Sequence, residues 1–156
     1  MNKLLSLYNS LLKKYGKQNW WPAETEYEIV VGALLTQNTN WRNVEKSIIN
    51  LKKNNSLHPE KILKLNSNKL KELIKPSGFY NQKAPRLKEL TKKYSSIKNK
   101  KLSIEKLREE LLSVKGVGKE TADSIILYAF NKPIFVIDAY TKRFCKFYNL
   151  FNGKNY

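Results

Sequence analysis

The residues best suited to bind a charged ligand lie in the segment 115–119. Gly116 and Gly118 flank Val117 between two stretches with helical periodicity, and a lysine stands on each side. Glycine permits positive φ and close approach of another backbone, and the amides that open the next helix attract anions. The segment therefore predicts a phosphate-binding turn, although Gly-x-Gly alone also fits an ordinary helix connection.

Other residue types that carry chemistry are scarce. The single cysteine, Cys145, excludes an internal disulfide and any zinc or iron–sulfur site built from several cysteines of this chain. The single histidine, His58, stands beside Pro59, where we expect a surface position. We therefore expect no metal site.

The composition favours a globular protein with a polyanionic partner. The chain has 156 residues, 41% of them apolar, and 30 basic against 13 acidic side chains give a net charge of +17. Nucleic acid is the first partner to consider, although a lysine-rich composition can also arise without selection for binding. No apolar run approaches the roughly 20 residues of a membrane span and the start lacks a secretory signal, so we expect a cytoplasmic location.

Apolar residues recur at helical spacing along most of the chain, which predicts an all-α fold. The run 134–137 is apolar enough for a strand, but it has no partner strand. Pro85 should fall in the first turn of its helix. The expected helices cover residues 4–15, 26–35, 41–53, a short segment from Pro59, a segment capped by Ser67, 80–94, 103–112, 119–130 without interruption, and 139–148 capped by Asp138.

Four motifs then point to one family. Residues 112–123 (LSVKGVGKETAD) resemble the helix–hairpin–helix of the endonuclease III superfamily of DNA glycosylases. Segments 135–143 (FVIDAYTKR), 32–39 (GALLTQNT) and 77–84 (SGFYNQKA) resemble three further family motifs in the family's order. The resemblance implies the all-α helix–hairpin–helix glycosylase fold, with Asp138 at the position of the catalytic aspartate.

The resemblance also implies a domain organisation. One glycosylase domain over 1–156 should comprise a six-helix, barrel-like part with the hairpin (20–134) and a truncated second helical part (1–19 plus 135–156). The family's last helices and cysteine cluster are not expected in this chain, which implies no iron–sulfur cluster. We expect a monomer whose shortened end exposes apolar side chains and allows self-association. Those side chains are Leu4, Tyr8, Leu11, Tyr15, Phe147, Leu150 and Phe151.

Double-stranded DNA with a flipped damaged base is the implied partner. Gln37 and Asn38 should fill the space that the base leaves. Lys142 and Arg143 should add charge contacts. The resemblance allows a monovalent cation at the hairpin and implies no other cofactor. The residues expected to hold the DNA backbone are Lys115, Gly116, Val117, Gly118, Lys119 and Thr121.

Tryptophans suggest the kind of base. The segment Trp20-Trp21-Pro22, with Trp41 after residues 35–40 (LTQNTN), resembles the branch that includes 3-methyladenine DNA glycosylases, in which these positions form the base pocket. Alkylated purines carry positive charge, and aromatic faces attract cations. An alkylated purine is therefore the expected substrate.

The expected reaction is hydrolysis of the N-glycosidic bond, with the Asp138 carboxylate stabilising the oxocarbenium-like transition state. Bifunctional members carry a lysine two residues after the second hairpin glycine, where this chain has Glu120. This departure favours a monofunctional enzyme. We expect the protein in the cytoplasm, associated with the nucleoid. The alternatives are a bifunctional glycosylase and AP lyase that uses Lys119, and a truncated, inactive DNA-binding module.

Overall fold

The computed structural model describes residues 3–18 and 20–150, and the regular secondary structure in them is entirely helical. The chain divides into two compact units. The central unit comprises residues 23–136, and the split unit comprises residues 1–22 and 137–156. The sequence predicts these boundaries slightly earlier, after residues 19 and 134. The apolar run 134–137 has no regular secondary structure.

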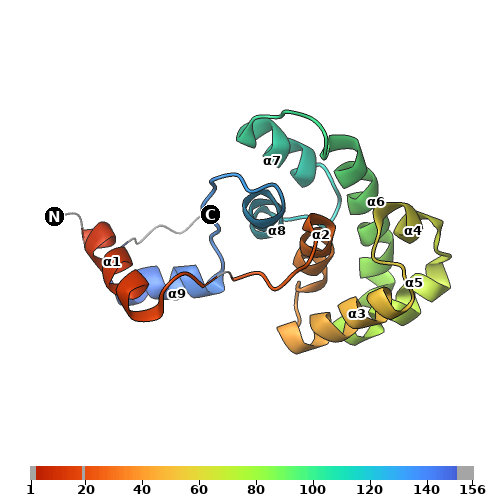
Figure 1. Ribbon diagram of the computed structural model, residues 1–156, viewed down its shortest axis with the longest axis horizontal. Helices are drawn as coiled ribbons and strands as arrows, with labels where there is room; N and C mark the ends of the chain where they lie inside the picture. The colour runs from red at the N-terminus through yellow and green to blue at the C-terminus, as the bar shows by residue number, and fades with distance from the viewer. Residues whose placement is uncertain (1–2, 19, 151–156) are drawn as a thin grey trace. The chain divides into compact units, whose positions relative to one another are not determined.

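The central unit consists of helices that follow one another through short turns (Figure 1). They are α2 (Glu26–Leu35), α3 (Trp41–Lys53), α4 (Pro59–Lys64), α5 (Ser67–Ile74), the 3₁₀ turn η1 (Lys75–Ser77), α6 (Tyr80–Ile97), α7 (Ile104–Leu112), α8 (Lys119–Ser124) and the π-helical η2 (Ile125–Ala129). The bounds of α2 and α3 are those predicted.

Capping side chains explain why several of these helices start where they do. The side-chain oxygens of Thr25, Asn40 and Ser103 accept hydrogen bonds from the backbone N–H groups of the first turns of α2, α3 and α7. Such a cap contributes about 1 kcal/mol. The helix starts are therefore fixed locally by the sequence.

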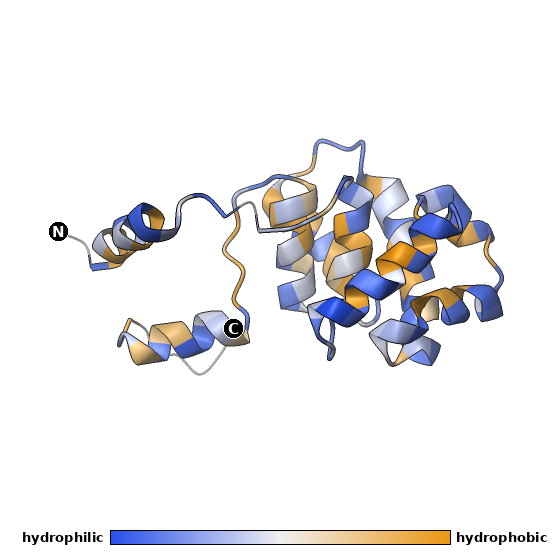
Figure 2. Ribbon diagram, turned by 60° about the horizontal axis from the view of Figure 1, so that its bottom comes forward, coloured by the Kyte–Doolittle hydropathy of each residue, from blue (hydrophilic) through white to orange (hydrophobic). Residues whose placement is uncertain are grey.

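Apolar packing holds the central unit together. Every buried apolar side chain among the described residues belongs to it, from Tyr27 to Ala129. α2 is buried along nearly its whole length, and in Figure 2 the apolar stretches of the central helices turn towards one another. This core fixes the elements that carry the hairpin.

Three local predictions are wrong. Asn66, not Ser67, caps α5, because its side chain accepts a hydrogen bond from Lys69 N. Pro85 is the sixth residue of α6 and so lies beyond the first turn. The helix from Lys119 does not run uninterrupted to residue 130, because it changes to π geometry at Ile125.

The split unit contains α1 (Lys3–Tyr15) and α9 (Ala139–Phe147), and neither helix has a buried residue. Leu4, Tyr8 and Tyr15 are each more than half exposed, as expected, and so is Phe147. Leu150 is half-buried, and Phe151 lies outside the described residues. None of the helices that the structure describes has the length and apolar character needed to span a membrane.

Candidate nucleic-acid interface

The hairpin between α7 and α8 is a tight turn anchored by two buried valines. Val117 N donates to Val114 O at 3.0 Å, and Gly116, the third residue of this turn, has φ +89°. A positive φ at this position characterises a type II turn and favours glycine. Val114 and Val117 are both buried. The hairpin backbone is therefore fixed before any ligand arrives.

The two hairpin glycines have different local reasons to be glycine. A Cβ on Gly116 would lie 2.5 Å from Arg86 Cδ and 2.7 Å from Arg86 Nε. A Cβ on Gly118 would meet nothing within 4 Å, and its φ is −89°. Folding therefore demands glycine at 116 but not at 118.

Gln37 joins the hairpin to the loop after α2. Its amide Nε2 donates to Gly116 O and to Thr121 Oγ1, each at 2.9 Å. The side chains of Thr121 and Val117 are both buried. Both N–H donors of the Gln37 amide are therefore used within the protein in the absence of DNA. That Gln37 fills the space left by a base stays a prediction, and it would require these two bonds to break.

Asn38 occupies the exposed tip of the same loop. Its φ is +53°, a left-handed conformation that asparagine adopts more readily than most residues. Thr39 N donates to Thr36 O at 3.2 Å and so closes the turn around it. Within the part of the chain that the structure describes, the Asn38 amide has no hydrogen-bond partner. Asn38, unlike Gln37, presents its amide to solvent.

A buried lysine supports this loop from inside. Lys83 is 2% exposed, and its Nζ donates to Leu35 O at 2.8 Å and to Ser77 O at 2.7 Å. These bonds tie α6 to the last carbonyl of α2 and to η1. Burial lowers the pKa of the Lys83 amine to about 8.

The remaining hairpin cations lie on the surface. Lys115 and Lys119 are exposed, and so is Glu120, one residue further along α8. Lys115 also lines an open hollow of about 580 Å³ between α6 and the hairpin, together with Lys92 and Lys93. One step along a helix turns a side chain by about 100°, so Lys119 and Glu120 point in different directions.

Behind the hairpin, an ion pair joins its two helices. Arg108 Nε on α7 donates to Asp123 Oδ1 on α8 at 2.6 Å, and Arg108 Nη2 donates to Asp123 Oδ2 at 3.2 Å. Asp123 is buried. This partly buried pair therefore links α7 to α8 on either side of the hairpin.

The predicted catalytic residue of the split unit caps α9, and the predicted charge-contact residues lie on this helix. Asp138 precedes the helix, is half-buried, and its Oδ1 accepts a hydrogen bond from Thr141 N at 2.6 Å, as predicted for an N-cap. Lys142 is exposed. The Arg143 guanidinium lies over the Tyr140 ring at 4.5 Å.

The tryptophans proposed for the base pocket are spread over both units. Trp20 is 71% exposed, Trp21 is half-buried and Pro22 is exposed, all in the split unit. Trp41 is half-buried and begins α3 in the central unit.

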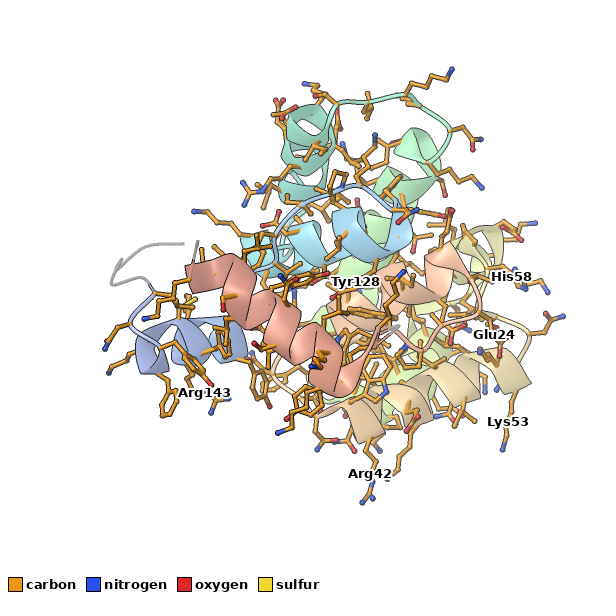
Figure 3. All side chains as sticks on the ribbon, turned by 60° about the vertical axis from the view of Figure 1, so that its left-hand side comes forward. Glu24, Arg42, Lys53, His58, Tyr128 and Arg143 are labelled. Atoms are coloured by element: carbon orange, nitrogen blue, oxygen red, sulfur yellow. The ribbon has the colours of Figure 1, made fainter. Side chains whose placement is uncertain are left out.

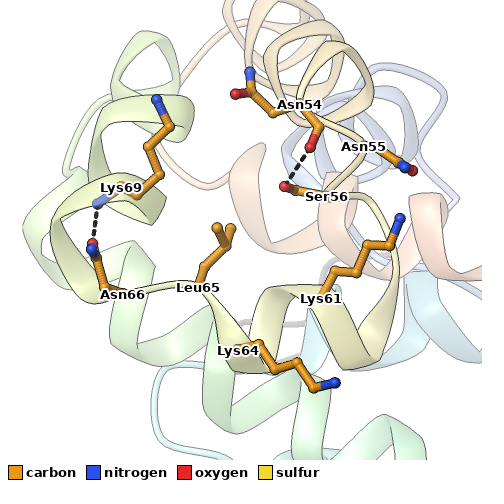
Figure 4. Close-up of a pocket in the computed structure, with 8 residues that line it drawn as sticks. All are labelled: Asn54, Asn55, Ser56, Lys61, Lys64, Leu65, Asn66 and Lys69. Atoms are coloured by element: carbon orange, nitrogen blue, oxygen red, sulfur yellow. Dashed lines mark hydrogen bonds between the residues drawn. The ribbon is translucent and has the colours of Figure 1, made fainter.

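Three exposed side chains and one surface hollow lie outside the predicted site. His58 is exposed before α4, and Arg42 and Lys53 extend outward from the two ends of α3 (Figure 3). A hollow of about 560 Å³ is lined by polar residues and by lysines that include Lys61 and Lys64 (Figure 4). None of the predicted site residues lines it. Among the described residues, no three His, Cys, Asp or Glu side chains are grouped to hold a metal ion.

Sequence reasoning missed the close approach of Arg86 to the hairpin. Its side chain lies against Gly116, thirty positions away in the chain. Arg86 follows the SGFYNQKA motif and Pro85, but this position gives no local sign of the contact.

These features define a helix–hairpin–helix DNA glycosylase fold. The chain belongs to the HhH-GPD superfamily of base excision DNA repair proteins, whose family pattern matches residues 31–156. A protein of Methanocaldococcus jannaschii assigned by its name to the DNA repair glycosylases is 53% identical over 97% of this chain and 72% of its own length. Endonuclease III of Thermotoga maritima is 30% identical over 88% of this chain and 62% of its own length.

Solved structures agree in fold. The H. pylori 3-methyladenine DNA glycosylase bound to 1,N6-ethenoadenine superposes with a TM-score of 0.81 at 36% identity, over 98% of this chain and 74% of that one. An endonuclease III–DNA complex superposes with a TM-score of 0.77 at 19% identity, over 100% of this chain and 73% of that one. By family, the chain is a base excision repair DNA glycosylase.

Proposed function

We propose that this protein hydrolyses the N-glycosidic bond of an alkylated purine in double-stranded DNA and leaves the sugar–phosphate backbone intact. The observation that carries the substrate class is the likeness, at 36% identity over nearly the whole chain, to a 3-methyladenine DNA glycosylase. The Trp20-Trp21-Pro22 segment and Trp41 support it from the sequence.

The central unit supplies DNA binding in this proposal. The hairpin takes a backbone phosphate, and Gly118 leaves room for close approach because no side chain covers it. Lys115 and Lys119 add charge beside the turn. Phosphate contacts carry no sequence information, which suits an enzyme that must search undamaged DNA.

Asn38 fills the space left by the extruded base, since it stands alone at the exposed tip of its loop. Gln37 positions the hairpin relative to that loop through its two hydrogen bonds. A damaged base costs less to extrude than an intact one, and an inserted amide compensates for part of that cost.

The Asp138 carboxylate serves the chemical step. Capping uses Oδ1, so Oδ2 is the oxygen that we assign to the sugar or to the attacking water. A negative charge there stabilises the developing oxocarbenium ion and can accept a proton from the water. A cationic purine is already a good leaving group, so the site needs no strong general acid and no cofactor.

The proposed base pocket uses stacking by Trp20, Trp21 and Trp41 and contact with Pro22. A cationic base gains attraction to aromatic faces that a neutral base lacks. Lys142, exposed on α9, adds a charge contact to the DNA backbone.

The absence of strand cleavage rests on Glu120, a carboxylate where bifunctional relatives place a lysine nucleophile. Borohydride with damaged duplex should trap no covalent protein–DNA adduct. An adduct that forms with the native protein and is absent with Lys119→Ala would contradict this proposal and show a bifunctional enzyme that uses Lys119.

The substrate class is tested by chromatography of the bases that the protein frees from methylated and from oxidised duplex DNA. We expect 3-methyladenine well ahead of neutral lesions such as hypoxanthine or thymine glycol. Equal release from both, or release from oxidised DNA alone, would contradict the alkylpurine assignment. Binding without any base release, in both the native protein and Asp138→Asn, would support a non-catalytic module.

A further inference from the structure

We propose that Arg86 is a further DNA-binding residue, whose guanidinium takes a backbone phosphate beside the hairpin. This inference rests on the proposed function, because it assumes that the hairpin faces DNA. It adds a residue from α6, outside the helix–hairpin–helix itself, to the binding surface.

The Arg86 side chain lies directly against the hairpin turn. Arg86 Cδ, Nε and Cζ lie 2.5, 2.7 and 3.1 Å from the point where a Cβ on Gly116 would stand. The far end of the Arg86 side chain therefore lies across the Cα of the hairpin turn. The glycine allows this approach, so the turn and the guanidinium form one continuous surface.

The surroundings of the Arg86 guanidinium favour an external ligand. Arg86 is half-buried, yet within residues 3–18 and 20–150 it has no hydrogen bond and no ion pair. Glu89, one turn further along α6, pairs with Lys92 instead at 2.8 Å. Five N–H donors held in place against a backbone turn, with no acceptor from the protein, suit an external anion.

Arginine suits a phosphate contact better than lysine does. The planar fork of arginine matches a phosphate with two parallel hydrogen bonds, whereas lysine offers a point charge. The chain has 26 lysines and only four arginines, Arg42, Arg86, Arg108 and Arg143. Arg108 pairs with Asp123, and Arg143 stacks on Tyr140. Arg86 is the arginine placed against the hairpin.

The test is the salt dependence of binding to an undamaged duplex, which does not depend on the lesion. Arg86→Met keeps the packing of the stem and removes the charge. Lys98→Met is the matched control, because it removes the same charge from the same helix, about 18 Å away at a rise of 1.5 Å per residue. Lys98 caps α6 and is exposed.

For Arg86→Met, we expect affinity to fall about tenfold or more. The slope of log K against log salt should decrease by about 0.9, the value for one lost phosphate contact. Lys98→Met should keep the native slope. Equal slopes in the two variants would overturn the inference.

Arg86→Lys keeps the test decisive if Arg86→Met does not fold, as judged from its melting curve. Its slope should match the native protein while its affinity is lower, because the charge remains and the fork is lost. Native affinity in Arg86→Lys would overturn the inference.

The native protein is measured first. If it does not bind duplex DNA, both the proposed function and this inference are wrong. If it binds and the Arg86 variants behave like the control, only this inference is wrong.

Discussion

The central unit and the split unit differ in how their proposed functional residues are held. In the central unit, Gln37 bridges the loop and the hairpin, Lys83 supports the loop, and a continuous apolar core lies beneath. In the split unit, Asp138 and Lys142 belong to α9, a helix with no buried residue. The surface proposed to bind DNA is therefore prebuilt, whereas the residue proposed for the chemistry has only local support. Changes in the hairpin should alter DNA affinity, and changes at Asp138 should alter the rate of base release.

Hydrogen exchange gives the broadest test of this difference. Amides in α2 and α6 should exchange roughly a thousandfold more slowly than those in α1 and α9. Local opening of α1 or α9 exposes no apolar core and therefore costs little free energy. Mass spectrometry of the native protein measures both sets at once. Similar protection in all four helices would remove the contrast between the units.

Asp138→Asn tests the chemical role assigned to the split unit. Asparagine caps helices as well as aspartate does, so α9 should persist. Single-turnover base release should slow by roughly a hundredfold or more, while DNA affinity stays equal or rises because a negative charge is removed. Unchanged excision would show that Asp138 is only a helix cap.

Trp41→Ala tests a residue that lies in the central unit but is proposed to act in the chemical step, by stacking on the base. Loss of one stacking partner costs about 1–3 kcal/mol, so base release should slow by roughly one to two factors of ten. Affinity for undamaged duplex should not change. A defect limited to undamaged DNA would move Trp41 from the base pocket to the backbone-binding surface.

Gly118→Ala and Gly116→Ala separate binding from folding within the hairpin. Gly118→Ala should keep the native melting temperature and weaken binding to any duplex about tenfold, because only an approaching phosphate meets the new methyl group. Gly116→Ala should lower both, because its φ is positive and its Cβ collides with Arg86. The double variant Gly116→Ala with Arg86→Ala should recover part of the lost stability. If Gly118→Ala binds normally, the phosphate does not approach that glycine.

Lys83 gives the smallest expected effect, a dependence of stability on pH. Its folded-state pKa, about 8, lies below the ordinary 10.5, so between these values the unfolded chain binds more protons and stability rises with pH. A neutral amine still has two N–H donors for Leu35 O and Ser77 O. From pH 7 to 9.5, urea unfolding should show the native protein gaining roughly 1–2 kcal/mol relative to Lys83→Met. Parallel pH profiles would show that Lys83 does not titrate in this range.

Local patterns predicted most of the helices but few of the contacts between them. Thr25, Asn40 and Asp138 each cap a helix through a neighbouring amide, and such signals lie within a few residues in the sequence. The prediction of Ser67 as the cap of α5 was wrong because Asn66 and Ser67 are both good capping residues, and the surrounding residues decide between them.

The links that build the candidate interface join distant positions. Gln37 lies 79 residues from Gly116, and no periodicity or turn signal encodes which amide will meet which carbonyl. The same holds for Arg86 and Gly116. The contacts that position the candidate site could therefore not be predicted from the sequence.

The π-helical turn Ile125–Ala129 bears on how this chain can change in length. It holds an additional residue per turn, with Phe130 N bonded to Ile125 O at 3.1 Å. In an ordinary α-helix, an inserted residue rotates everything beyond it by about 100°. Here the extra residue is taken up within one turn, so Thr121 keeps its contact with Gln37 while Ile126 and Ala129 still reach the core. Deletion of one residue from Ile125–Ala129 is therefore expected to return this segment to α geometry without rotating the hairpin end of the helix against the core.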